Sequence, residues 1–138
     1  MMPLTVQEVP IEFVNVVWPS VEGFIASAIE HANGDLTLDE TKINCAHGHW
    51  HLLVAVDENN VVQGAATLYY FNRINDRVAF ITTIGGKGIF TRELFSQFSD
   101  ILKLRGATCV EGAVRDSLVR FTARLGAKKK TTTVYIPL

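Results

Sequence analysis

A β-branched run that leads through three glycines and a lysine into a helix is the feature that most restricts the fold of this chain. It is the stretch TTIGGKGIFTREL, from Thr82 to Leu94. Glycine adopts backbone conformations that other residues avoid, so a strand can turn sharply here. Successive N–H groups in such a turn can also converge on an anion, and a helix N-terminus adds positive charge. The stretch predicts a strand–loop–helix unit, which is either a phosphate-binding loop or a tight chain reversal.

The residues before this stretch predict short strands and amphipathic helices. We expect a first strand in LTVQEV, a break at Trp18–Ser20, and a helix with apolar residues at helical spacing from Val21 to Ile29. Thr37 and Glu40 have capping-box spacing, which predicts a second helix that ends near Gly48. HWHLLVAV, the polar turn DENN and VVQGAATLYYF predict a β-hairpin, and RVAFITTI predicts the strand that precedes the glycines.

The residues after the glycines predict a second half of alternating helices and strands. A helix is expected from about Thr91 to Arg105, followed by the strand TCVEGAV, the helix DSLVRFTARLG and the closing strand TTTVYIPL. Short turns favour antiparallel pairing for the middle strands, and the helical connection after the loop favours a parallel neighbour. The fold class is therefore α/β, a single domain over residues 1–138 with a mixed central sheet of about six strands flanked by about four helices.

Composition agrees with one globular domain and places opposite charges in the two halves of the chain. Of the 138 residues, 48% are hydrophobic and 20% are charged. Residues 1–60 contain nine acidic residues and one basic residue, whereas residues 61–138 contain five acidic and twelve basic residues. The two halves can attract each other across one fold, or the basic half can face an anionic ligand.

A short run of alternating cysteine and histidine residues could hold a metal ion or supply a general base, or it could have no role in chemistry. Cys45, His47, His49 and His51 alternate in CAHGHWH, but the expected helix end and strand start should separate them, so we expect no metal site. His49 or His51 is a candidate general base, because the ordinary pKa of histidine suits neutral pH. Cys45 and Cys109 are interpreted as small buried thiols in a reducing compartment.

Basic residues gather near the end of the chain, where they suggest a nucleic-acid surface at first sight. They are Arg115, Arg120, Arg124 and Lys128–Lys130. Arg115 is out of line with the two other arginines, and no stacking aromatics are interleaved, so we interpret the cluster as a solvated helix face and expect no nucleic-acid binding. Arg115, which should follow a strand close to the loop, is instead a candidate phosphate contact. The aromatic run LYYF is interpreted as strand packing.

The element order, the loop GGKG after the fourth strand and the ending VRDSLVRFTARLGAKK together resemble the GCN5-related N-acetyltransferase (GNAT) superfamily, in particular small divergent members encoded by bacteriophages. The resemblance covers essentially the whole chain in element order. It implies that the loop after the fourth strand wraps the pyrophosphate of acetyl-coenzyme A (acetyl-CoA). The cofactor-binding residues that the resemblance implies are Ile84, Gly85, Gly86, Lys87 and Gly88. Arg115, the candidate phosphate contact named above, is added to this set.

The chain departs from the family pattern at the positions of its catalytic groups. The strand offers only Thr82 and Thr83 where many members carry a glutamate general base. The last helix has Thr122, with Phe121 beside it, where many members carry a tyrosine general acid. The loop of the family follows the pattern of Gln or Arg, two residues, Gly, one residue, then Gly or Ala; aligned on Gly86 and Gly88, this pattern puts Thr83 at the Gln/Arg position. We therefore assign no catalytic residue.

Two hypotheses follow from this combination of a matching loop and missing acid–base groups. The first is an acetyl-CoA-binding acetyltransferase-like enzyme, acting on an unknown amine, with weak or lost catalysis. The second is an inert protein of the same fold, either a phage virion component or a protein that binds a host partner. The N-terminus shows no secretory signal and no run is long enough to span a bilayer, so we expect a cytoplasmic protein without membrane contact. We also expect that TTTVYIPL, if exposed, can pair across a homodimer.

Overall fold

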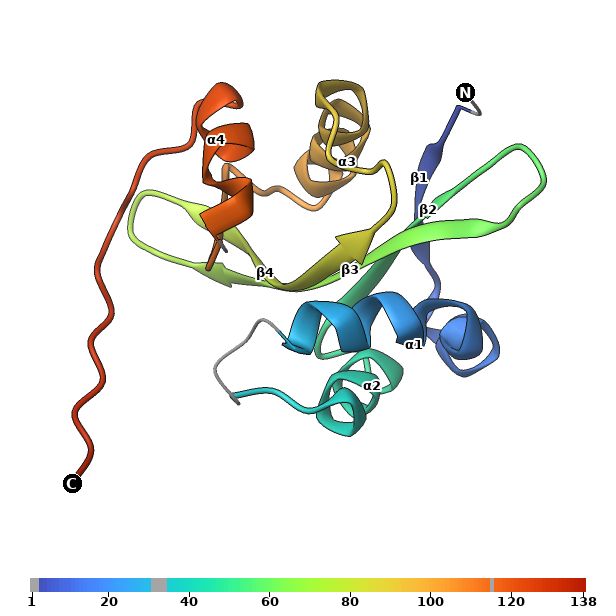
Figure 1. The fold of residues 1–138 in the computed structure, drawn as a ribbon, viewed down its shortest axis with the longest axis horizontal. Coiled ribbons are helices and arrows are strands. Elements are labelled where there is room, and N and C mark those ends of the chain that lie inside the picture. Colours follow the sequence, from blue (N-terminus) through green and yellow to red (C-terminus); the bar gives the residue numbers. More distant parts are fainter. Residues whose placement is uncertain (1–2, 31–34, 115) are drawn as a thin grey trace.

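The computed structural model describes residues 3–30, 35–114 and 116–138, and these form one mixed sheet with helices on both faces (Figure 1). In chain order the elements are β1 (Thr5–Val9), a 3-10 turn (Ile11–Phe13), α1 (Val14–Glu30), α2 (Leu38–Ala46), β2 (His51–Val56), β3 (Val62–Asn72), β4 (Arg77–Gly86), α3 (Arg92–Leu104), β5 (Cys109–Gly112) and α4 (Asp116–Arg124). The α/β fold class and the four helices agree with the expectation from the sequence.

The sheet has the strand order β1-β2-β3-β4-β5. Its first four strands are antiparallel neighbours joined in chain order, and β5 pairs with β4 in parallel after the α3 crossover. This arrangement confirms the antiparallel middle and the parallel neighbour that connection lengths predict.

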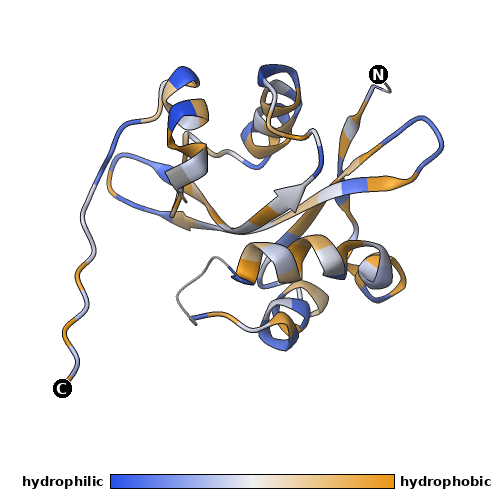
Figure 2. Cartoon of the chain, viewed as in Figure 1, coloured by the Kyte–Doolittle hydropathy of each residue, from blue (hydrophilic) through white to orange (hydrophobic). Residues whose placement is uncertain are grey.

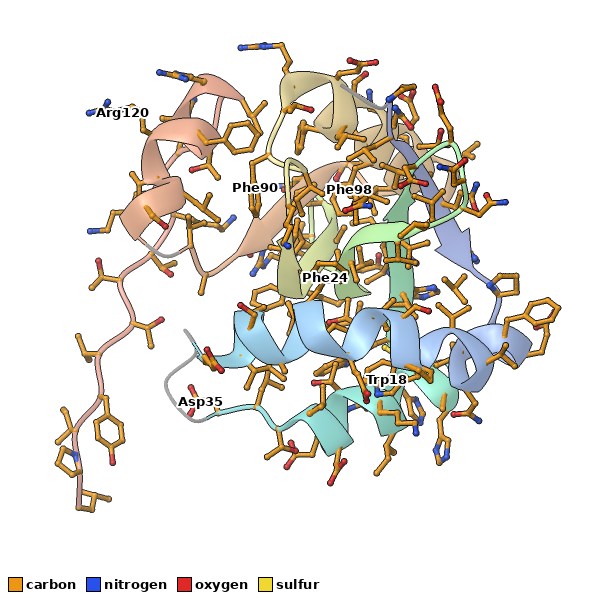
Figure 3. All side chains as sticks on the ribbon, turned by 45° about the vertical axis from the view of Figure 1, so that its right-hand side comes forward. Trp18, Phe24, Asp35, Phe90, Phe98 and Arg120 are labelled. Atoms are coloured by element: carbon orange, nitrogen blue, oxygen red, sulfur yellow. The ribbon has the colours of Figure 1, made fainter. Side chains whose placement is uncertain are left out.

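The helices form two layers that bury different faces of the same strands. Helices α1 and α2 cover one face, and α3 and α4 lie on the other side of the sheet (Figure 1). Trp18 and Ile25 of α1 pack in the core of the first face, and Phe98 and Leu102 of α3 pack in the core of the second. In Figure 3 the labelled Trp18 and Phe24 lie on the α1 side, and Phe98 lies on the α3 side. None of the described helices is both long enough and apolar enough to cross a bilayer.

Helix α1 corrects the predicted break at Trp18–Ser20. The helix runs without interruption from Val14 to Glu30 and contains Pro19. Proline removes one N–H and disfavours the helical conformation of its predecessor, which is why the sequence favours a break. Trp18 is fully buried in the core while Pro19 lies on the exposed side, so packing of the tryptophan outweighs the lost hydrogen bond.

The expected sixth strand, TTTVYIPL, is absent from the described sheet, which has five strands. Residues 127–138 have no regular structure and are exposed throughout. The prediction follows correctly from β-branched residues, but a strand forms only where a neighbour satisfies its backbone, and this segment leaves the sheet after α4 (Figure 1).

Two predicted local signals are confirmed at the level of single hydrogen bonds. The Thr37 hydroxyl caps α2 by accepting the N–H of Glu40 at 3.1 Å. In the β2–β3 turn, one carboxylate oxygen of Asp57 accepts the N–H groups of Asn59 and Val61, at 2.8 and 3.0 Å. All three bonds join residues within four positions of each other, which is why the sequence could predict the cap and the turn.

Candidate functional site

The candidate site lies where β4 and β5 separate. The parallel ladder pairs Val78 with Cys109 and ends where Ile81 pairs with Gly112. Strand β4 continues to Gly86 with β3 as its only described neighbour. A strand that loses its neighbour partway exposes backbone groups to whatever enters the gap, which makes this edge the natural place for a ligand.

A bulge in β4 marks the point of separation. The β3–β4 register shifts from Leu68↔Ile81 to Thr67↔Thr83, so Thr82 is an extra residue. The hydroxyl of Thr67 lies 2.6 Å from the hydroxyls of both Thr82 and Thr83, and the Thr82 hydroxyl also donates to the carbonyl of Thr67 at 2.9 Å. The bulge turns two consecutive threonines to one side of the strand. Both hydroxyls are hydrogen-bonded to Thr67 of β3.

Ile84 ends the predicted strand and lies in β4, and Gly85 and Gly86, which are predicted to lie in the loop, belong to β4 as well. They pair with Ala66, Ala65 and Gly64 of β3. The strand therefore continues two residues beyond its predicted end at Ile84, because Gly64 in β3 allows the two backbones to approach closely there.

The two glycines at the end of β4 are required by packing. A Cβ on Gly85 would lie 2.6 Å from the carbonyl oxygen of Phe24 in α1. A Cβ on Gly86 would lie 2.5 Å from the Cα of Gly64, and its φ of +154° is also unusual for other residues. Dense packing at these two positions explains the glycines without any ligand.

Residues 87–90 connect the end of β4 to the start of α3. The N–H of Lys87 donates to the carbonyl of Gln63 at 2.9 Å, and Ile89 packs back over Gly64. Gly88 has a φ of +66°, and a Cβ there would meet nothing within 4 Å. The backbone N–H groups of Gly88, Ile89 and Phe90 have no acceptor within the described residues. Of the three glycines, Gly88 is thus the one beside open space.

The start of α3 completes the donor set of the loop. The Thr91 hydroxyl caps the helix by accepting the N–H of Leu94 at 3.2 Å, as the sequence predicts. Lys87 and Arg92 are exposed cations on either side of the free N–H groups, and Glu93 adds one opposing charge in the first turn. The set combines backbone donors, two cations and the positive end of a helix, which suits a diphosphate. Arg115, the other predicted phosphate contact, lies outside the described residues.

A shallow groove of about 320 Å³ runs between α3 and the end of α4. Its lining residues are Arg92, Phe95, Ser96, Ser99, Asp100, Lys103 and Leu125. The guanidinium of Arg92 donates to the carbonyl of Arg124 at 2.9 Å and so ties the two helices together. Phe90 meets Phe121 of α4 edge-to-face, with ring centroids 6.0 Å apart. In Figure 3 the labelled Phe90 lies between these helices.

The family's acid position in α4 has no acid. Thr122 donates its hydroxyl to the carbonyl of Val119 at 3.0 Å, and the aromatic ring of Phe121 carries no proton to give. Within the described residues, neither Thr82 and Thr83 in β4 nor Phe121 and Thr122 in α4 carries a group that exchanges protons near neutral pH.

The histidines do not converge on this site. His47 and His49 are exposed after α2, and Cys45 is buried in α2, where burial raises the pKa of its thiol to about 12. His51, at the start of β2, instead lies 3.6 Å from the carboxylate of Glu8. Within the described part of the chain, no three His, Cys, Asp or Glu side chains lie close enough to hold a metal ion.

A polar cluster that the sequence did not indicate surrounds Tyr70 on the α3 face. His51 packs edge-on against its ring at 5.0 Å, and the guanidinium of Arg77 lies 5.0 Å from the ring centroid. The Tyr70 hydroxyl is buried without a hydrogen-bond partner among the described residues, and burial, with the charge of Glu8 second, raises its pKa. Glu8 also forms an ion pair with Arg105, the residue that follows the end of α3. No spacing signal could reveal the cluster, because its members come from four different strands and from the residue after α3.

The opposite face carries a half-buried row of rings. Tyr69 stacks on Trp50 and on Phe80, at centroid distances of 6.1 and 5.3 Å. Arg73 lies over Phe71 at 4.8 Å and forms an ion pair with Glu111 of β5. These contacts agree with the interpretation of LYYF as strand packing.

Comparison with known proteins places the fold but not the activity. No protein-family profile and no curated protein sequence matches the chain. An aminoglycoside acetyltransferase, meta-AAC0020 from an uncultured soil metagenomic sample, solved in complex with sisomicin, matches with a TM-score of 0.67 and 14% identity over 98% of this chain and 96% of its own. A second one, HMB0005, has a TM-score of 0.67 and 15% identity, and covers 99% of each chain. A Trypanosoma brucei acetyltransferase has a TM-score of 0.63 and 13% identity over 99% and 100%. The chain therefore has the GNAT-like fold of acetyltransferases.

Proposed function

We propose that this chain is an acetyl-CoA-binding, N-acetyltransferase-like protein in which catalysis is weak or lost. The observation that carries the proposal is that three N–H groups, those of Gly88, Ile89 and Phe90, have no acceptor among the described residues and follow the end of β4, beyond the stretch in which β4 has lost β5 as a neighbour. Unpaired backbone donors next to an open space are ready to bind an anion without rearrangement. The fold shared with acetyltransferases supports the coenzyme as that anion.

Two parts of the site would bind two different parts of the coenzyme. Gly88, Ile89 and Phe90 would hold the pyrophosphate through their N–H groups, with Lys87 and Arg92 adding charge. The gap beyond Ile81 and Gly112 would receive the extended arm. When bound, acetyl-CoA supplies an activated acetyl thioester. Each of these contacts is weak at an exposed surface, about 0.3–1 kcal/mol for a helix end, so binding depends on their sum.

Weak turnover follows from the threonines at the acid and base positions. A positioned acid or base contributes about 10²–10⁴ in rate, and this chain lacks both at the usual places. What remains is the alignment of a thioester with an amine, which by itself accelerates transfer. An amine that is already deprotonated at the working pH is the substrate class that such a site can serve.

The alternative proposal is an inert protein of this fold that serves as a phage virion component or binds a host partner. Two observations favour it: the hydroxyls of Thr67, Thr82 and Thr83 satisfy one another, and Phe90 contacts Phe121 beside the groove. Both hypotheses keep the architecture but differ in whether the coenzyme binds.

A thermal-shift titration with acetyl-CoA separates the two. At a coenzyme concentration of about one hundred times Kd, binding adds about 2.7 kcal/mol of stability. Gly88→Ala is the informative variant, because Gly86 cannot be changed without disturbing β3. Gly106→Ala is its matched control: φ is +83° there, and the added Cβ meets only Arg77, at 3.5 Å. We expect Gly88→Ala to lose most of the shift and Gly106→Ala to keep it. A wild-type protein that shows no shift at millimolar coenzyme would support the inert alternative.

A further inference from the structure

Residues 127–138, the tail, carry a basic run followed by an apolar run, and both runs are exposed. The basic run is Lys128–Lys130. After three threonines, Val134 is 75% exposed, Tyr135 is 86% exposed and Ile136 is 74% exposed. Figure 2 shows this change from hydrophilic to alternating hydrophobic residues, and Figure 1 shows the tail ending away from the body. The tail therefore suits a surface that offers negative charge together with an apolar interior.

The tip of the β3–β4 hairpin adds a second apolar projection beside the start of the tail. Ile74, at this tip, is 101% exposed. A shallow hollow of about 480 Å³ is lined by residues 73–76 of the tip and by Lys130 of the tail, so the two segments lie side by side. Both lie on the same side of the molecule in Figure 1. Two segments distant in the sequence thus present apolar side chains next to cations.

The cations on this side of the molecule are only partly neutralised. From residue 116 to the end of the chain there are five basic residues and one acidic residue. Lys130 lies 3.4 Å from the carboxylate of Glu111. Among the described residues, no ion pair engages Arg120, Lys128 or Lys129. In Figure 3 the labelled Arg120 points away from the body. Unpaired cations of this kind attract a negatively charged surface.

The apolar run favours a lipid bilayer over a nucleic acid as that surface. Single-stranded nucleic acids are bound by cations together with rings that stack on the bases, and Tyr135 is the one aromatic residue among residues 127–138. Valine and isoleucine do not bind phosphates, but they enter the boundary between lipid headgroups and acyl chains, where tyrosine is also enriched. An apolar contact or a basic patch alone gives weak membrane binding, and this surface combines the two.

We propose that the tail and the tip of the β3–β4 hairpin form a surface that binds anionic lipid bilayers. Lys128 and Lys129 contact the lipid headgroups. Val134, Tyr135 and Ile136 enter the boundary between headgroups and acyl chains, and the hairpin tip enters beside them. The expectation of no membrane contact rests on the length of apolar runs, which decides whether a chain spans a bilayer and not whether it binds at the surface. The inference does not depend on coenzyme binding.

Sedimentation of the full chain with lipid vesicles tests the proposal. We expect binding at low salt to phosphatidylcholine vesicles that contain phosphatidylserine, much weaker binding to phosphatidylcholine alone, and release at high salt. Lys128→Gln combined with Lys129→Gln should weaken binding to the anionic vesicles by about thirtyfold, through the loss of two surface cations. Equal binding to both kinds of vesicle would overturn the proposal, as would a chain that binds duplex DNA but no vesicles.

A second pair of substitutions tests the apolar contribution. Val134→Asp combined with Ile136→Asp should abolish vesicle binding without lowering the melting temperature, because the tail is exposed. The matched control combines Val16→Asp in α1 with Ile43→Asp in α2, residues that are 75% and 55% exposed. It makes the same chemical changes outside the tail and should bind vesicles as the wild type does. Binding that survives the two aspartates in the tail would overturn the proposal.

Brominated lipids test where the tail lies in the bound state, because bromine in the acyl chains quenches nearby tryptophan fluorescence. Tyr135→Trp should lose emission when such vesicles bind. The wild-type chain should keep its emission, since Trp18 lies in the core of the α1 face and Trp50 packs against that core. Vesicle binding without quenching in Tyr135→Trp would show that another surface makes the contact and would contradict the proposal.

Discussion

Phe90 in the loop after β4 meets Phe121 in α4 edge-to-face, with ring centroids 6.0 Å apart. Phe121 lies one helical turn before Leu125, which lines the groove between α3 and α4. The pair therefore stands at the end of the groove nearest the free N–H groups. An edge-to-face pair contributes about 0.5–1.5 kcal/mol beyond its burial, so it resists separation only moderately.

The first prediction concerns this ring pair. If the rings must separate to admit the coenzyme, Phe121→Ala removes that cost, and the Kd for acetyl-CoA should fall by up to about tenfold. Calorimetric titration of the variant measures the change. Phe95→Ala, which alters the groove wall but leaves the pair intact, is the comparison. A Kd that rises in Phe121→Ala would mean that the ring contacts the coenzyme instead of obstructing it.

The second prediction compares two glycines with opposite surroundings. Gly85→Ala places a methyl 2.6 Å from the carbonyl oxygen of Phe24 and should destabilise the fold by about 1–3 kcal/mol. Gly23 is an exposed residue of α1, and a Cβ added there meets nothing within 4 Å. Gly23→Ala should therefore stabilise the fold by about 0.5–1 kcal/mol. Denaturant unfolding of both variants measures the difference. Equal effects at the two sites would refute the packing role of Gly85.

The third prediction concerns acid stability at the β2–β3 turn. The N–H of Val61, and less strongly those of Asn59 and the Gln63 side chain, lower the pKa of Asp57. A lowered folded-state pKa gives stability that is present above the ordinary aspartate pKa and is lost as the pH falls below it. Asp57→Asn should therefore melt at a lower temperature near neutral pH and lose less stability on acidification. Melting curves at a series of pH values measure this. Parallel pH profiles for Asp57→Asn and wild type would contradict it.

The fourth prediction separates the two thiols. Cys45 is 1% exposed and burial raises its pKa to about 12, whereas Cys109 is partly exposed. Because the thiolate is the reactive form, an alkylating reagent should modify Cys109 in the folded protein and Cys45 only after unfolding. Peptide mass spectrometry after timed labelling reads both sites. Labelling of both at similar rates under native conditions would show that α2 opens readily.

The parts of the fold that could be predicted from the sequence are those set by neighbouring residues. The Thr37 and Thr91 caps and the Asp57 turn each depend on residues within four positions, and all are present. The continuation of α1 through Pro19 depends on the burial of Trp18, and the closing strand fails to form because residues 131–138 have no neighbouring strand. Both are properties of the assembled fold, so the sequence could not predict them.

The candidate site shows the same division. The sequence indicated the strand, the glycine-rich loop and the start of the helix. It could not indicate that Gly85 packs against Phe24 and Gly86 against Gly64, because these partners are distant in the chain. The contact between Phe90 and Phe121 and the cluster around Tyr70 arise only when separate elements meet. Hydrophobic periodicity carries no information about such encounters.

Coenzyme binding is tested most directly by calorimetric titration of the chain with acetyl-CoA. We expect saturable binding with one site per chain, competed by free coenzyme A and weakened in Gly88→Ala. A flat titration at millimolar coenzyme would contradict this expectation, and would leave a protein with the acetyltransferase fold but without the cofactor.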